Sequence, residues 1–239
     1  DEITYAIHSI GFIDSVKLQP MHQDGVWFFL TNLFTKFLGV NVLGIRFLAV
    51  IIGTISILLI YLLGKEIFDK KTGILASVII SISSLHILFS EAQMDVPMAF
   101  FALLGIYFLT LFFKKDRKLF FVLAWSCLGI AIMIKQIALL FIPAFVIFSL
   151  YYNKKNHKSW KIKQILYAAI IIVLFVTPVL AHNYLLYQDK GLVDMQFSRF
   201  LGIAKEQYAP IANTLQPFSF YTIFIQAHHE EGQPPGLYT

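Results

Sequence analysis

Six long apolar runs follow one another through the middle of this chain, separated by short polar connections. They occupy residues 47–63, 74–89, 96–113, 119–134, 137–152 and 165–181. A helix needs ~20 apolar residues to cross the hydrocarbon core of a bilayer, and each run approaches that length once its flanking residues are added. Six such runs, in a chain that is 58% hydrophobic and 14% charged, predict an all-α polytopic transmembrane protein.

The connections between the runs differ in charge. Three alternate connections carry twelve of the 19 Lys and Arg residues and only three of the 14 acidic residues. The basic residues are Lys65, Lys70, Lys71, Lys114, Lys115, Arg117, Lys118, Lys154, Lys155, Lys158, Lys161 and Lys163. Short cytoplasmic loops of membrane proteins are enriched in Lys and Arg. We therefore expect these connections in the cytoplasm and the remaining loops on the extracytoplasmic face, and we expect no nucleic-acid partner.

This assignment of sides divides the chain into three parts. Residues 1–45 are expected to form an outer loop, with interfacial helices in apolar stretches such as 26–38. Residues 46–187 would hold six transmembrane helices with short connections. Residues 188–239, which include four prolines, would form an outer-face tail. Because an outer loop requires a preceding span, we expect the sequence to be a fragment whose first span and later part are missing.

Two acidic motifs lie at the predicted outer face. Asp1 and Glu2 open the chain, and Glu91 and Asp95 are pinched between two apolar runs. Carboxylates at the ends of spans cost free energy unless something requires them. Four residues apart, Glu91 and Asp95 would share one face of a helix and repel each other, so they would need a cation or a metal. The simpler alternatives are ordinary interface residues for Asp1-Glu2, and a solvated turn with Asp95 as a helix N-cap before Pro97.

Cationic residues are expected at the same depth. Lys135 falls between two apolar runs and Arg46 opens another. Either side chain could simply extend to the lipid head groups, or it could hold a phosphate at the membrane surface. His22 and His86 are more often structural histidines than ligands. Carboxylates and cations gathered at one outer surface match a phosphate-linked lipid whose head group reacts there, with the cations on the phosphate and a carboxylate taking a proton.

The order of motifs resembles the polyprenyl-phosphate-sugar-dependent glycosyltransferases of the GT-C fold, which include the protein O-mannosyltransferases and the aminoarabinose transferases of lipid A. The resemblance covers roughly residues 1–152. It rests on Asp1-Glu2 with Tyr5, Gly44-Ile45-Arg46-Phe47-Leu48, Leu63-Gly64-Lys65-Glu66-Ile67-Phe68 with Thr72-Gly73, Ser90-Glu91-Ala92-Gln93-Met94-Asp95-Val96-Pro97, and Gly129-Ile130-Ala131 with Lys135. Gln93 stands where the family commonly has Arg, and His22 is followed by Gln23 where the family often has Pro.

The resemblance implies an inverting transfer of a sugar from a dolichyl or undecaprenyl phosphate to a protein, lipid or glycan acceptor on the extracytoplasmic face. It implies Asp1 as the general base, with Glu2 and Asp95 shaping and orienting the site. Arg46 and Lys135 would steady the departing lipid phosphate.

Two further expectations complete the interpretation of the site. Glu91 and His22 are the remaining candidate substrate-binding residues. No cofactor is assigned, no metal ligands are named, and a divalent metal at the carboxylates stays open.

Two other functions remain open from the residues alone. A transporter or flippase would bind a substrate or cation at the outer carboxylates. Transporters, however, place ionisable residues near the bilayer midplane, often in helices broken by Gly or Pro. Here the acids lie at the ends of the runs, which favours the enzyme. A structural membrane subunit without activity is the third alternative.

Overall fold

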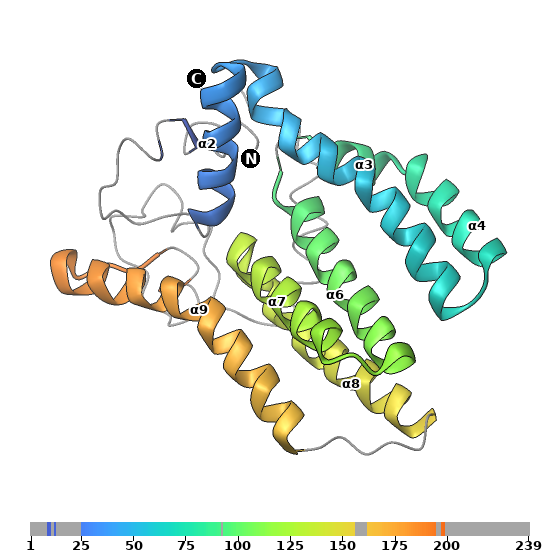
Figure 1. Cartoon of the computed structure of the whole chain (residues 1–239). Helices are drawn as coiled ribbons and strands as arrows, with labels where there is room; N and C mark the ends of the chain where they lie inside the picture. The colour runs from blue at the N-terminus through green and yellow to red at the C-terminus, as the bar shows by residue number, and fades with distance from the viewer. Residues whose placement is uncertain are drawn as a thin grey trace. The chain divides into compact units, whose positions relative to one another are not determined.

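The structure is a computed structural model, and it describes residues 25–91, 93–155 and 162–194, together with residues 9, 10, 12, 197 and 198 (Figure 1). Asp1, Glu2, Tyr5 and His22 lie outside the described residues, as do residues 199–239. The expected roles of these residues and of the tail therefore stay predictions.

Helices account for all the regular secondary structure in the described residues. They are α2 (Gly25–Leu38), α3 (Val42–Ile67), α4 (Lys70–Ser81), α5 (Ser84–Phe89), α6 (Asp95–Lys115), α7 (Lys118–Ile134), the 3₁₀ helix η1 (Gln136–Leu140), α8 (Phe141–Lys155) and α9 (Ile162–Lys190). This confirms the all-α prediction. Helix α2 lies where an interfacial helix was expected, and it buries Trp27 and Phe28.

Four helical segments of the described chain are long and apolar enough to cross a membrane. They are Val42–Ile67, Asp95–Lys115, Gln136–Asn153 and Lys163–Lys190. Helix α7 is apolar but shorter, and the run at residues 74–89 is divided between α4 and α5. The division falls at Ser83, whose hydroxyl caps α5 by accepting a hydrogen bond from the His86 N–H. A multi-pass membrane protein is confirmed, whereas the count of six spans stays a prediction.

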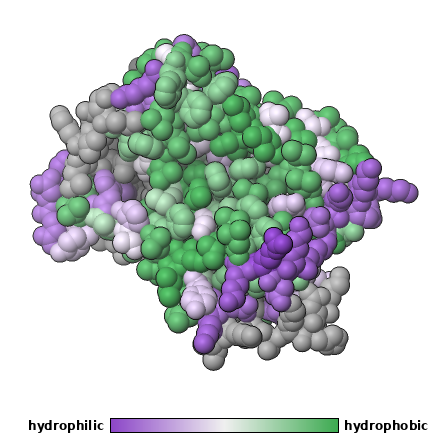
Figure 2. Space-filling model, in the orientation of Figure 1, coloured by the Kyte–Doolittle hydropathy of each residue, from purple (hydrophilic) through white to green (hydrophobic). Residues whose placement is uncertain are grey.

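Apolar side chains are exposed along the sides of these helices. On α3, Val50, Ile55 and Leu58 are about half exposed, and α4 exposes Leu75 and Ile79. Figure 2 shows hydrophobic residues over much of the visible surface. Lipid tails are as apolar as leucine, so such a surface is stable in a bilayer. Close packing between helices in a bilayer depends instead on small residues at their contacts.

Helices α3 and α4 form a hairpin that is held together by two glycines. A Cβ on Gly64 would lie 2.8 Å from the Gly73 Cα, and one on Gly73 would lie 2.5 Å from the Tyr61 carbonyl oxygen. Only glycine permits backbones this close. Asp69 starts α4 by accepting a 2.8 Å hydrogen bond from the Thr72 N–H. This bond lowers the pKa of Asp69, so the cap stabilises α4 above the ordinary carboxyl pKa and is lost as the pH falls through the lowered value.

Helix α6 packs against α3, α7 and α8. At its C-terminal end the Lys114 Nζ donates to the Glu66 carbonyl oxygen at 2.6 Å and to Glu66 Oε2 at 2.8 Å. These contacts bring together the C-terminal ends of α3 and α6, so the two helices run in the same direction. Aromatic rings fill the interior around α7, where Trp125 lies 5.5 Å from Phe145 between ring centroids. Gly105 leaves room for the Phe145 ring, which a Cβ would approach to 2.6 Å.

The chain divides into two compact units, the first holding residues 1–18 and 23–182 and the second residues 19–22 and 183–239. In the second unit, Asn183 and Asp194 form a buried double hydrogen bond. The Asn183 amide donates to Asp194 Oδ2, and the Asp194 N–H donates to Asn183 Oδ1, both at 2.8 Å. Asn183 is 5% exposed and Asp194 2% exposed. The two hydrogen bonds give each of these buried side chains a partner, as buried polar groups require.

Candidate functional site

One end of the first unit holds four of the predicted site residues, and they form two ion pairs. The segment between α5 and α6 contributes Glu91 and the first residue of α6 is Asp95, while α3 contributes Arg46 and the end of α7 contributes Lys135. Because α3 and α6 run in the same direction, their first turns lie at the same end. The four side chains come from three distant parts of the sequence.

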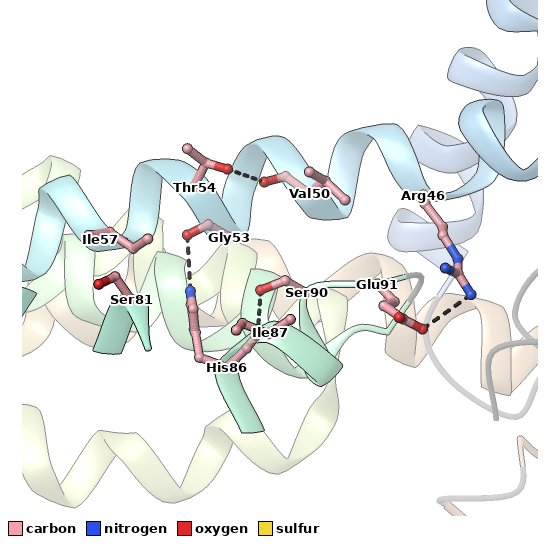
Figure 3. A pocket seen from close by; sticks show the side chains of 10 residues that line it. All are labelled: Arg46, Val50, Gly53, Thr54, Ile57, Ser81, His86, Ile87, Ser90 and Glu91. Atoms are coloured by element: carbon pink, nitrogen blue, oxygen red, sulfur yellow. Dashed lines mark hydrogen bonds and ion pairs between the residues drawn. The ribbon is translucent and has the colours of Figure 1, made fainter. Parts of the chain in front are cut away.

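Arg46 pairs with Glu91. Asn41 caps α3 by accepting a 2.9 Å hydrogen bond from the Gly44 N–H, which places Arg46 in the second turn of the helix. The Arg46 Nη2 lies 3.2 Å from Glu91 Oε2, as Figure 3 shows. Both side chains are more than a third exposed, at 36% and 38%. Exposed pairs of this kind contribute at most about 1 kcal/mol, so a competing anion can displace Glu91.

Lys135 pairs with Asp95 more tightly. Lys135 is the C-cap of α7 and has an extended backbone conformation. Its N–H donates to the Ala131 carbonyl. Its Nζ donates to Asp95 Oδ1 at 2.7 Å, and its side chain is 20% exposed, against 35% for Asp95. The shorter distance and the deeper burial make this the stronger of the two pairs.

The alternative interpretation of Asp95 as a helix N-cap is wrong. Helix α6 begins at Asp95 itself, the cap residue is Met94, and no side chain caps the helix. The carboxylate is engaged by Lys135 from the neighbouring helix instead. Asp95 still lies in the first turn, where the helix dipole stabilises a negative charge.

Between the two pairs, Met94 anchors the acidic motif. Met94 is fully buried, and its carbonyl accepts a hydrogen bond from the Met98 N–H. Gln93, which stands where the family commonly has Arg, is half-buried. An ion pair at each end and a buried methionine between them fix the position of the acidic motif relative to α3 and α7.

A pocket of about 330 Å³ opens beside the Arg46–Glu91 pair, between α3 and the α4–α5 segment. Figure 3 shows the residues that line it, among them His86 and Ser90. The His86 Nε2 lies 3.1 Å from the Gly53 carbonyl oxygen, and the Ser90 hydroxyl donates to the His86 carbonyl at 2.5 Å. His86 thus has a structural contact, as the simpler interpretation expected.

Sequence reasoning did not find this pocket. On one of its walls, Gly53 permits the close approach of α3 to Ser90, because a Cβ there would lie 2.4 Å from the Ser90 hydroxyl oxygen. The signal in the sequence was a glycine in the middle of an apolar run, which often marks a close approach of two backbones.

The described residues do not form a metal site. No three His, Cys, Asp or Glu side chains gather among them, and Glu91 and Asp95 each face a cation. Asp1 and Glu2 lie outside the part of the chain that the structure describes, so their relation to the two ion pairs stays a prediction.

Comparison with known proteins shows which family the residues of this site match. The model of the dolichyl-phosphate-mannose-protein mannosyltransferase family matches residues 25–182, which include both ion pairs. An uncharacterized protein of Aquifex aeolicus (strain VF5) is 28% identical over 210 residues, which cover 86% of this chain and 40% of the relative. The chain thus spans about two-fifths of the length of that relative. No solved structure matches.

Proposed function

The chain belongs to the dolichyl-phosphate-mannose-protein mannosyltransferase family, and from this membership we propose that the protein transfers a sugar from a polyprenyl phosphate to an acceptor on the extracytoplasmic face of the membrane. The observation that carries the proposal is the pair of cation–carboxylate contacts at one end of α3, α6 and α7. A transporter is not favoured, because the matching family consists of glycosyltransferases.

The reaction needs a group that accepts a proton and groups that stabilise a phosphate. The acceptor's nucleophile attacks the anomeric carbon, a new bond forms there, and the bond from that carbon to the phosphate oxygen breaks. The polyprenyl phosphate leaves with the electron pair. We assign the Asp1 carboxylate as the base that takes the proton from the acceptor's nucleophile, with Glu2 and Asp95 orienting the reactants.

The two cations differ in how readily they reach a phosphate. The phosphate would displace Glu91 from Arg46, because that pair is exposed and its 3.2 Å contact is longer than the 2.7 Å contact between Lys135 and Asp95. Lys135 is held by Asp95 at 2.7 Å and would add a fixed positive charge beside the leaving group. His22 and Glu91 would contact the donor head group. The Lys135–Asp95 pair then links the phosphate to the carboxylate that orients the reactants.

Replacement of the general base tests the proposal. Asp1→Asn is made in the full-length protein. The amide keeps the size of the carboxylate and cannot take the proton, so sugar transfer should fall by at least ~10²-fold while donor binding is kept. The measurement is transfer of labelled sugar from polyprenyl phosphate, together with direct donor binding.

Asp69→Asn is the matched control, since it makes the same change at a helix cap that Asn fills as well as Asp. It should leave transfer unchanged. Normal transfer by Asp1→Asn would move the base to another residue, with Glu2 the next candidate. Absence of transfer by the unmodified protein, with every sugar-linked polyprenyl phosphate offered, would refute the proposed function itself.

A further inference from the structure

Basic side chains from two connections gather at the end of the first unit that lies opposite the candidate site. The candidate site lies at the first turns of α3 and α6, whereas these side chains lie at and beyond the last turns of the same helices. All seven are exposed, and they are Lys65, Lys70, Lys71, Lys114, Lys115, Arg117 and Lys118. The spans formed by α3 and α6 end at Ile67 and Lys115. The seven cations therefore lie where a span leaves the hydrocarbon, at the level of the lipid head groups.

Contacts within the unit bring the two connections side by side. The Lys114 Nζ donates both to the carbonyl and to the carboxylate of Glu66, which joins the end of α6 to the end of α3. The close approach of Gly64 and Gly73 holds the start of α4 against α3. Figure 1 shows the α3–α4 turn and the C-terminal end of α6 on the same side. Together the seven cations form one surface, which we call the basic surface.

The acidic residues of the two connections do not neutralise the basic surface. Residues 65–71 and 114–118 contain three acids, Glu66, Asp69 and Asp116, so seven basic residues against three acidic ones leave a net charge of +4. The Glu66 carboxylate is held by Lys114, and the Asp69 carboxylate accepts a hydrogen bond from the Thr72 N–H at the start of α4. An anion that binds here therefore meets an excess of positive charge.

Three of these cations lie in the first turns of helices, where they do not stabilise their own helix. Lys70 and Lys71 begin α4, and Lys118 begins α7. The N-terminal end of a helix carries a partial positive charge that favours anions and disfavours cations. The lysines and the two helix ends therefore attract the same kind of ligand, an anion outside the helices.

Exposed apolar side chains border the basic surface and decide which anion fits it. Phe68, in the turn between α3 and α4, is 72% exposed, and Leu119, which follows Lys118, is 63% exposed. Figure 2 shows hydrophilic residues in a band beside the hydrophobic surface. Nucleic acid or an acidic protein loop would leave such apolar side chains in water. A phospholipid supplies a phosphate and acyl chains together, and clusters of Lys and Arg next to a span are typical of binding to anionic lipids.

We propose that the basic surface binds anionic phospholipids of the membrane, with their phosphates among the cations and their acyl chains against Phe68 and Leu119. Phosphatidylglycerol carries one net negative charge, whereas the choline of phosphatidylcholine cancels the charge of its phosphate. The surface therefore prefers phosphatidylglycerol. This inference goes beyond the proposed function, because these lipids are not consumed in sugar transfer and bind at the other end of α3 and α6.

Spin-labelled lipids test the preference without requiring turnover. The full-length protein is reconstituted in phosphatidylcholine vesicles with a trace of spin-labelled phosphatidylglycerol or spin-labelled phosphatidylcholine. Electron paramagnetic resonance measures the fraction of each labelled lipid whose motion the protein restricts, and the two fractions give a relative association constant. We expect phosphatidylglycerol to associate at least about threefold more strongly than phosphatidylcholine. The ratio should fall towards one in about 1 M salt, where the Debye length is only ~3 Å.

Two matched variants locate the preference on the protein. The first neutralises four exposed cations of the basic surface by combining Lys70→Gln, Lys71→Gln, Arg117→Gln and Lys118→Gln. Three of these positions are in first turns, where a neutral residue suits the helix better than a cation does. This variant should lose at least about half of the preference for phosphatidylglycerol. The control removes the same charge from the third basic connection by combining Lys154→Gln, Lys155→Gln, Lys158→Gln and Lys161→Gln, and it should retain the preference.

Three results would overturn the inference. Equal association of the two lipids with the unmodified protein would leave the basic surface without a lipid partner. Equal losses in the two variants would assign the preference to net charge instead of this surface. A preference that persists in high salt would mean that the phosphate charge is not what the protein recognises. The salt series needs no substitution, so it decides even if a variant fails to fold. Sugar transfer does not enter the measurement, so failure of the proposed function would leave these results unchanged.

Discussion

At the scale of single residues, the four charged side chains differ in how freely they can change partners. Arg46 and Glu91 are joined at 3.2 Å and both are more than a third exposed, whereas Lys135 and Asp95 are joined at 2.7 Å with a less exposed lysine. The first pair is suited to opening when an anion arrives. The second is suited to holding the start of α6 in place.

Neutralising Glu91 tests the first of these roles. Glu91→Gln removes the carboxylate that competes with a phosphate for Arg46, so polyprenyl phosphate should bind about 2–5-fold more tightly, in line with the small energy of exposed pairs. Arg46→Ala should weaken binding. The measurement is equilibrium binding of polyprenyl phosphate at low salt, where exposed charges are least screened. Weaker binding by Glu91→Gln would mean that the contact of this carboxylate with the donor head group outweighs its competition with the phosphate for Arg46.

The role of Lys135 in donor binding is tested by changing its charge and by changing its partner, Asp95. Lys135→Ala should weaken donor binding about tenfold, and Lys135→Arg should recover part of it, because the charge is kept while the geometry changes. A double-mutant cycle with Asp95→Asn should give a coupling energy of about 0.5–3 kcal/mol in donor binding. If Lys135→Ala binds donor normally, the lysine serves only to hold Asp95.

The sequence predicted which residues gather at this end but not how they pair. The order of the apolar runs was enough to place Arg46, Glu91, Asp95 and Lys135 at one depth. The pairing could not be predicted, because Arg46 and Glu91 are 45 residues apart and Lys135 and Asp95 are 40 residues apart. Partners at such separations depend on helix packing, which apolar periodicity does not specify. The alternative of an N-cap at Asp95 is wrong for the same reason, because the carboxylate pairs with a lysine 40 residues away.

At the scale of helices, the contact between α3 and α4 depends on the absence of two side chains. Gly73→Leu should destabilise the protein by about 1–3 kcal/mol, because its Cβ would lie 2.5 Å from the Tyr61 carbonyl and the hairpin would have to open. Val78→Leu is the control, since it places the same residue at a half-exposed position of α4. The measurement is resistance to thermal unfolding in detergent. Equal stability of the two variants would mean that α3 and α4 are not in close contact.

The boundaries of the helices were predicted less well than their existence. The run at residues 74–89 was interpreted as one span, but the helix starts earlier, at Lys70, and breaks at Ser83. Both differences come from capping side chains, Asp69 at the start and Ser83 at the break. A single hydroxyl within an apolar run changes the average hydropathy little, so the length of the run does not reveal a helix break at that residue.

At the scale of the whole molecule, the sides of the membrane remain a prediction from charge. A cysteine in place of Lys115 should resist an impermeant thiol reagent in intact cells, and one in place of Gln93 should react, because Lys115 belongs to a basic connection. Both are introduced into the Cys127→Ala protein, which carries no other cysteine within this sequence. Labelling at Lys115 but not at Gln93 would reverse the orientation and place the candidate site in the cytoplasm.

The interruption between α4 and α5 also bears on the thickness of the surrounding membrane. Helix α4 has 12 residues and rises about 18 Å, well short of the ~30 Å hydrocarbon core of a typical bilayer. Either α5 completes the crossing or the lipid around α4 becomes thinner to match it. Local thinning would bring head groups deeper beside the pocket that opens next to Arg46. The distance that a carrier's phosphate must travel to reach the ion pairs would then depend on the acyl-chain length of the host membrane.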